Sequence, residues 1–171
     1  MKTDIWARAR NSIVAGLALA ATTALPAAAA DWVLGVKVTD FGSSRASTTA
    51  GLNLEVHGRP YWHLGPLALG FAAAGTIDTK GNAWVGVGLS ALGEGASPWF
   101  FEASLMPGYY RASNERFDLG KALEFRSLIG VGYRLTPDTR VSLALSHVSN
   151  ASRGRINPGA DSLSLRIRRA F

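Results

Sequence analysis

A histidine and a serine two residues apart, followed by a carboxylate, are the residues of this chain best suited to covalent chemistry. His147 and Ser149 lie in the stretch 145–151, and Asp161 follows a segment rich in turn-forming residues. In an extended strand, side chains at positions i and i+2 point to the same face, so His147 and Ser149 are expected to be neighbours. A tight hairpin would bring Asp161 beside them. Serine, histidine and an acid are the components of an activated serine nucleophile, which indicates an ester hydrolase.

Each of the three side chains has a distinct role in this hypothesis. His147 takes the proton from Ser149, and Ser149 attacks an ester carbonyl. Asp161 orients the imidazole and stabilises its protonated form.

The loop 151–160 supplies further candidates. Asn157, or backbone N–H groups of this glycine-rich loop, would stabilise the oxyanion. Two arginines of the same loop, Arg153 and Arg155, would bind the phosphate of a lipid head group, because a guanidinium matches phosphate geometry.

The N-terminal segment has the features of a secretory signal peptide. A basic start precedes an apolar run over residues 13–25, and small residues lead up to Ala30. We therefore expect cleavage after Ala30, which makes residues 1–30 the signal peptide and residues 31–171 a single mature domain.

Composition excludes several classes of protein. Removing the signal peptide takes three of the 18 basic and one of the 12 acidic residues, which leaves a net charge of +4. That excess is too small and too scattered to indicate nucleic-acid binding, although it suits an anionic membrane surface. The chain has no cysteine, which excludes disulfides and a thiol nucleophile. The histidines lack the spacing of metal ligands, and neither a metal nor a cofactor is predicted.

Strands, rather than helices, are expected to build the mature domain. After the signal peptide, no apolar run is long enough to cross a bilayer as a helix. Eight segments alternate apolar with polar or small residues at a period of two, the pattern of strands. Their apolar faces begin at Trp32, Leu52, Leu67, Val85, Phe101, Leu123, Val141 and Leu163.

The second face of these segments indicates a barrel. It mixes charged residues with many glycines, which suits the crowded interior of a small barrel, and aromatic residues near strand ends fit membrane girdles. We therefore predict an all-β fold, an eight-stranded antiparallel transmembrane β-barrel in the bacterial outer membrane. A soluble lipocalin-like barrel is the alternative, disfavoured because the apolar face continues across nearly all the strands.

The candidate catalytic residues lie on the face that is otherwise apolar. Continuing by twos from Leu145 gives His147 and Ser149, and going back by two from Leu163 gives Asp161. Polar residues on a lipid-facing surface are unfavourable unless they are paired or near the interface. With both termini in the periplasm, this end of the hairpin lies level with the outer leaflet, so we expect a site open to membrane lipid.

At these residues the sequence resembles the lipid A 3-O-deacylase (PagL-type) family. The hallmark of that family is a His-x-Ser-Asn-Ala segment near the C-terminus, matched here by residues 147–151. An Asn-containing turn and an acid follow, matched by Asn157 and Asp161. The resemblance implies the same barrel, the same nucleophile, base and acid, and an oxyanion role for Asn157. We assign Asn150, inside the motif, a positioning role.

One departure concerns the acid, because the best-known acid of the family is Glu where this chain has Asp161. Aspartate is one methylene shorter, so the hairpin must bring it closer to His147, which affects the rate more than the role. The resemblance also implies the substrate, the 3-O-linked hydroxyacyl ester of lipid A in outer-leaflet lipopolysaccharide. A homodimer is left open.

Two other functions stay open on the sequence alone. The first is a non-enzymatic small outer-membrane barrel used for adhesion, resistance or membrane structure. The second is a different lipid-remodelling enzyme, such as a phospholipase or an acyltransferase. The shared outward face of the three candidate residues favours an enzyme acting on membrane lipid over a structural barrel.

Overall fold

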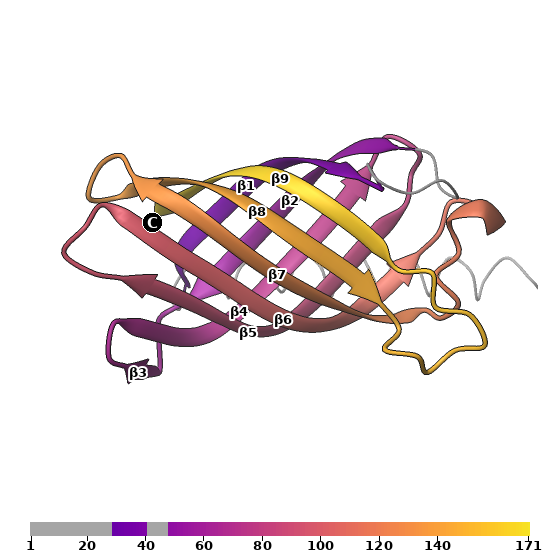
Figure 1. Ribbon diagram of the computed structural model, residues 1–171, viewed down its shortest axis with the longest axis horizontal. Coiled ribbons are helices and arrows are strands. Elements are labelled where there is room, and N and C mark those ends of the chain that lie inside the picture. The colour runs from indigo at the N-terminus through magenta and orange to yellow at the C-terminus, as the bar shows by residue number, and fades with distance from the viewer. Residues whose placement is uncertain (1–28, 41–47) are drawn as a thin grey trace, which may run out of the picture.

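The fold is a closed barrel of eight long antiparallel strands (Figure 1). The computed structural model describes residues 29–40 and 48–171, so the proposed signal peptide lies outside the described residues except for its last two. The barrel strands are β1 (Ala29–Thr39), β2 (Thr49–Gly58), β4 (Leu67–Asp78), β5 (Ala83–Glu94), β6 (Trp99–Arg111), β7 (Leu123–Arg134), β8 (Thr139–Ser149) and β9 (Ala160–Ala170). No helix in these ranges is long and apolar enough to cross a membrane.

Closure of the sheet confirms the predicted fold class. Neighbouring strands pair in the order β2-β1-β9-β8-β7-β6-β5-β4, and a further pairing of β2 with β4 completes the ring. The sequence pattern missed two short elements. Strand β3 (Trp62–Leu64) pairs with the start of β4, and the 3-10 helix η1 (Glu115–Phe117) lies between β6 and β7.

The two faces of the wall have the polarity that the period-two pattern predicts. Large apolar side chains such as Leu34, Val85 and Leu143 are about half exposed on the outside. Charged side chains such as Glu55 and Arg166 are buried inside. An apolar exterior over a polar interior is typical of a membrane-spanning barrel.

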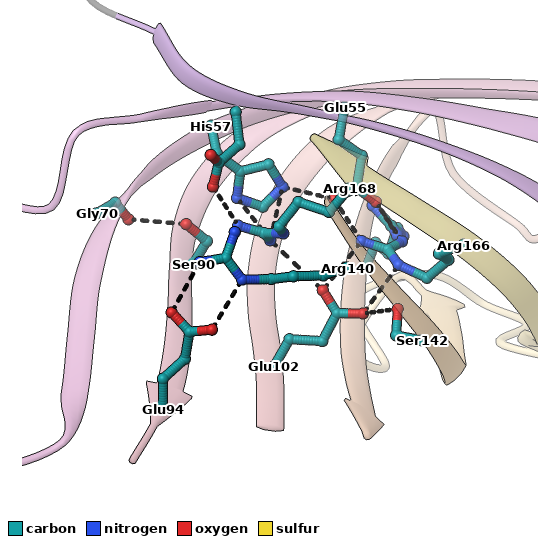
Figure 2. A network of polar contacts seen from close by, with 12 residues as sticks. Glu55, His57, Gly70, Ser90, Glu94, Glu102, Arg140, Ser142, Arg166 and Arg168 are labelled. Carbon is teal, nitrogen blue, oxygen red and sulfur yellow. Dashed lines mark hydrogen bonds and ion pairs between the residues drawn. The ribbon is translucent and has the colours of Figure 1, made fainter. Parts of the chain in front are cut away.

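Ion pairs across the lumen hold the interior together (Figure 2). The Glu55 carboxylate accepts hydrogen bonds from Arg126 at 2.6 Å and from Arg166 at 2.8 and 3.0 Å. A second carboxylate, Glu102, accepts a hydrogen bond from Ser142 at 2.6 Å and forms an ion pair with Arg166 at 3.0 Å. Because buried charges are unfavourable unless they are paired, this network stabilises much of the polar face that barrel closure buries, although both carboxylate oxygens of Glu124 have no hydrogen-bond partner among the described residues.

Strand direction decides which segments meet at each end of the barrel. Strands β6 and β8 both run toward the end where η1 and the β8–β9 loop lie, on the right of Figure 1. The C-terminus and β3 lie at the opposite end. The segment that carries His147 and Ser149 is therefore at the loop-rich end, remote from the C-terminus.

Candidate active site

The structure brings His147 and Asp161 together, as the sequence predicts. The two residues are direct partners across β8 and β9. His147 Nδ1 lies 2.8 Å from Asp161 Oδ1, and the two side chains are 48% and 71% exposed on the outside of the barrel. A carboxylate bonded to Nδ1 orients the ring and leaves Nε2 to act as a base.

Ser149 lies on the same outward face, at the last residue of β8, where it is half-buried opposite Phe125 of β7. Within the described ranges, no hydrogen bond joins its hydroxyl to His147. Such bonds are often long in enzymes without substrate and tighten in the Michaelis complex. The geometry therefore places base and acid in contact, whereas the candidate nucleophile lies two residues further along the same face of β8, paired with Phe125.

A second serine near His147 is a residue that the sequence reasoning missed. Ser127 of β7 is the register partner of His147, so Ser127, His147 and Asp161 form one row across three strands. Apart from residues at strand ends, the outward face of the barrel strands is otherwise apolar or aromatic. The signal was available in the sequence, because Ser127 follows Phe125 by two on the lipid-facing side.

Gly159 packs directly against the imidazole of His147. A Cβ at this position would lie 2.7 Å from His147 Cε1, and the backbone has a φ of +66°. Both facts favour glycine, since only glycine adopts this conformation freely and lacks the clashing atom. The turn after Pro158 thus holds the ring of the base in place.

Asn150 is a buried junction between two loops. Its side-chain amide donates hydrogen bonds to the carbonyl oxygens of Leu119 at 2.7 Å and Ile156 at 2.8 Å. Its own Oδ1 accepts a hydrogen bond from the N–H of Gly154 at 3.4 Å. The residue after the candidate nucleophile therefore ties the β6–β7 loop to the β8–β9 loop and points away from lipid.

Asn157 lies in the β8–β9 loop, where only the oxygen of its side-chain amide makes a close hydrogen bond. Its Oδ1 accepts a hydrogen bond from the backbone N–H of Asn150 at 3.0 Å, while Nδ2 has one long contact of 3.5 Å to Ser152 Oγ. Ala151 and Ser152 have φ values of 53° and 60°, which non-glycine residues rarely adopt. The loop beside Ser149 is strained, and the Asn157 Nδ2 group retains hydrogen-bonding capacity for a ligand.

The two loop arginines differ in their surroundings. The guanidinium of Arg153 stacks over the ring of Phe125, with its Cζ 5.2 Å from the ring centroid. Because Phe125 is the cross-strand partner of Ser149, this contact holds a positive charge next to the candidate nucleophile. Arg155 is exposed, with no polar contact among the described residues.

A groove on the outside of the barrel leads away from the site. The groove is lined by His147 and Asp161 at the loop-rich end of the barrel, and it continues over Ser127, Ile129 and Leu145. A second, almost wholly apolar hollow shares Ile129 and Leu145 and extends to residues Phe101, Val131, Leu143 and Leu163. Because the two hollows share residues, they adjoin and form one apolar furrow. The furrow extends from the row of Ser127, His147 and Asp161 along the lipid-facing wall, away from the loops.

Within residues 29–40 and 48–171, no group of three or more His, Asp or Glu side chains is arranged to hold a metal ion.

The comparisons with known proteins agree with the fold and with the motif at the site. Residues 44–170 match the family model described as lipid A 3-O-deacylase (PagL). The chain is 33% identical to a lipid A deacylase PagL from Bordetella bronchiseptica, in a match that covers 42% of this chain and 56% of that protein. The match thus spans little more than half the length of that relative.

Solved structures support the architecture. A crystal structure of the outer membrane enzyme PagL superposes with a TM-score of 0.66 at 22% identity, covering 83% of this chain and all of that one. Neisserial surface protein A superposes with a TM-score of 0.54 at 16% identity, covering 82% of this chain and 97% of that one. At these identities the likeness is one of fold.

Proposed function

The chain belongs to the lipid A 3-O-deacylase family, whose model covers most of its length, and from this we propose that it is an outer-membrane ester hydrolase that removes the 3-O-linked hydroxyacyl chain of lipid A. One observation carries the proposal beyond the family match. The hydrogen-bonded pair of His147 and Asp161 lies on the lipid-facing surface, next to Ser149. A structural barrel has no need of an ionisable pair there, whereas an enzyme acting on membrane lipid does.

The first half of the reaction uses the three outward residues. His147 Nδ1–H donates to Asp161, so Nε2 is free to accept the proton of Ser149. The Ser149 oxygen attacks the ester carbonyl and forms a tetrahedral intermediate. Collapse of the intermediate breaks the bond to the sugar oxygen, which takes the proton from His147 and leaves an acyl-enzyme.

The second half is hydrolysis of the acyl-enzyme. His147 takes a proton from water, the resulting hydroxide attacks the acyl carbonyl, and Ser149 recovers its proton as the fatty acid leaves. Asn157 Nδ2 and the backbone N–H groups of the strained loop are the proposed oxyanion donors. We assign Asn150 a positioning role, because its side-chain amide group donates hydrogen bonds to both loops and is not available to the substrate.

Substrate placement follows from the groove. The scissile acyl chain would lie in the apolar furrow below His147, along Ile129 and Leu145 toward Phe101, where it stays in contact with apolar surface. The phosphorylated head group would lie above, with Arg153 and the exposed Arg155 close to its phosphates. All of these groups come from one chain, so the chemistry does not require a homodimer.

The experiment is a mass spectrum of lipid A from outer membranes that contain the wild-type protein or Ser149→Ala at equal abundance. We expect lipid A from wild-type membranes to lose one hydroxyacyl group, and lipid A from the variant to stay intact. Loss with both proteins would mean that Ser149 is not the nucleophile. Intact lipid A with both, while the barrel is inserted, would exclude the deacylase; turnover of phospholipid would then indicate a phospholipase, and gain of an acyl group an acyltransferase.

A further inference from the structure

An aspartate with unusual backbone geometry lies beside the proposed catalytic acid. Strand β1 ends at Thr39, and the next residue, Asp40, has a φ of +57°. Its N–H donates a hydrogen bond to the carbonyl oxygen of Asp161 at 2.7 Å, one step beyond the Thr39–Ser162 pair that ends the β1–β9 ladder. Non-glycine residues occupy this region rarely, although aspartate is enriched there. The backbone of Asp40 is thereby held next to the site.

Asp40 lies at the boundary between two hollows, the outer groove and a hollow at the mouth of the barrel that Lys37 and Asp78 also line. Asp40 lines the same outer groove as His147 and Asp161, on the β1 side of that groove. Burial raises the pKa of the Asp40 carboxyl, a backbone hydrogen bond with Asp161 partly opposes that shift, and the negative charge of Asp161 adds to it. A carboxylate in such surroundings is stabilised by a ligand group that donates a hydrogen bond to it.

The distance between Asp40 and His147 decides whether the Asp40 carboxylate acts on the imidazole or on the bound substrate. Strands β8, β9 and β1 are consecutive neighbours, and strands lie about 4.8 Å apart, so Asp40 is roughly 10 Å from His147 around the wall. At an edge open to water that separation is about one Debye length, and the direct effect of Asp40 on the imidazole is small. A disaccharide head group, in contrast, is wide enough to reach both positions.

We propose that Asp40 is a substrate-binding residue whose carboxylate accepts a hydrogen bond from a hydroxyl or amide N–H group of the amino-sugar head group. The assignment rests on the proposed hydrolysis of lipid A. Arg153, held over Phe125 on the opposite side of Ser149, provides the complementary positive charge. A head group with phosphate at one place and hydrogen-bond donors at another would then bind in one orientation, with its acyl ester over Ser149.

The test compares two substrates that share the ester but differ in the head group. The variants are Asp40→Gly and Asp40→Asn, because both residues tolerate the positive φ and should preserve the turn. The substrates are purified lipopolysaccharide and the p-nitrophenyl ester of a 3-hydroxy fatty acid, which lacks the sugar. We expect Asp40→Gly to raise KM for lipopolysaccharide about tenfold, the effect of losing one charge-assisted hydrogen bond, with little change in kcat. Asp40→Asn keeps an uncharged acceptor and should have a smaller effect.

The simple ester supplies the decisive control. Any effect of the Asp40 charge on Asp161 would act equally on both substrates, so both variants should slow hydrolysis of lipopolysaccharide more than that of the p-nitrophenyl ester. Asp138→Asn, in the turn at the other end of the barrel, should behave as wild type on both substrates. Equal losses on both substrates would overturn the proposal, because Asp40 would then act through His147 or Asp161. Wild-type kinetics on both would also overturn it and leave Asp40 as the end of a strand. If wild type hydrolyses the simple ester through Ser149 but leaves lipopolysaccharide intact, the proposed substrate fails, and the role of Asp40 fails with it.

Discussion

The barrel wall carries two sets of acid–base residues on its two faces, and they differ in how completely their hydrogen bonds are satisfied. Inside, the Glu55 carboxylate lies among Arg166 and His57 (Figure 2) and also pairs with Arg126. The side chains of these four residues are at most 5% exposed. Outside, His147 and Asp161 share one hydrogen bond and remain about half or more exposed. Residues of the same kinds therefore stabilise the fold where they are buried and paired with several partners, and are available for chemistry where they are exposed and share a single hydrogen bond.

This contrast predicts opposite phenotypes for the two faces, and the largest effect is expected outside. Asp161→Asn keeps the shape of the acid but removes the charge that orients His147 and stabilises its protonated form. We expect kcat to fall by about 10⁴-fold, as the same substitution does in an unrelated Ser-His-Asp triad, with no change in the unfolding midpoint. Steady-state hydrolysis of the p-nitrophenyl ester and thermal unfolding in detergent would measure both. A variant that unfolds earlier would contradict the view that the exposed pair is dispensable for the fold.

The matching change inside should do the reverse. Glu55→Gln leaves the buried arginines without their shared carboxylate, and breaking a buried ion pair in this way costs about 3 kcal/mol of unfolding free energy. The kcat of the remaining folded protein should be unchanged. Urea unfolding in lipid vesicles, followed by tryptophan fluorescence, would give the stability, with exposed Glu115→Gln as the control. Loss of kcat without loss of stability would show that the lumen network takes part in catalysis.

Asn150 shares features with both sets of residues. It is buried like the lumen residues, yet it is adjacent to Ser149 and braces the loop that carries Asn157. Asn150→Ala should lower stability modestly and reduce kcat about tenfold, since two carbonyl oxygens lose their donors and the loop shifts. Asn150→Asp, which keeps the acceptor but not the donors, should resemble Ala in both measurements. A loss of stability alone would place Asn150 with the lumen network.

The smallest effect on the kinetics is expected for Arg153, in the exposed β8–β9 loop. Arg153→Gln removes the charge stacked on Phe125 and should raise KM for lipopolysaccharide about threefold while kcat stays constant, because rim charges contribute little. The effect should shrink at high salt, where phosphate contacts are screened. Kinetics at two ionic strengths would check it, with exposed Arg116→Gln as the control. A fall in kcat instead would mean that Arg153 stabilises the transition state.

Much of the fold and of the site was predictable because the period of a strand is two. Alternation over a few residues assigns each side chain to one face of the wall, and the apolar run through Leu143 and Leu145 places His147 and Ser149 on the lipid side. The same rule held for Asp161 and for the lumen position of Glu55. Ser127 obeyed it as well, but its place beside His147 depends on the register between β7 and β8, which alternation does not give.

The class of barrel, the face on which each side chain lies and the residue types available for ester hydrolysis all follow from the sequence, because they depend on local alternation and composition. The tertiary structure alone decided that His147 pairs with Asp161 at 2.8 Å, that Asn150 joins two loops and that Asp40 lies beside the acid. Those contacts depend on the register between strands and on how the loops close, and alternation along a single strand carries no information on either.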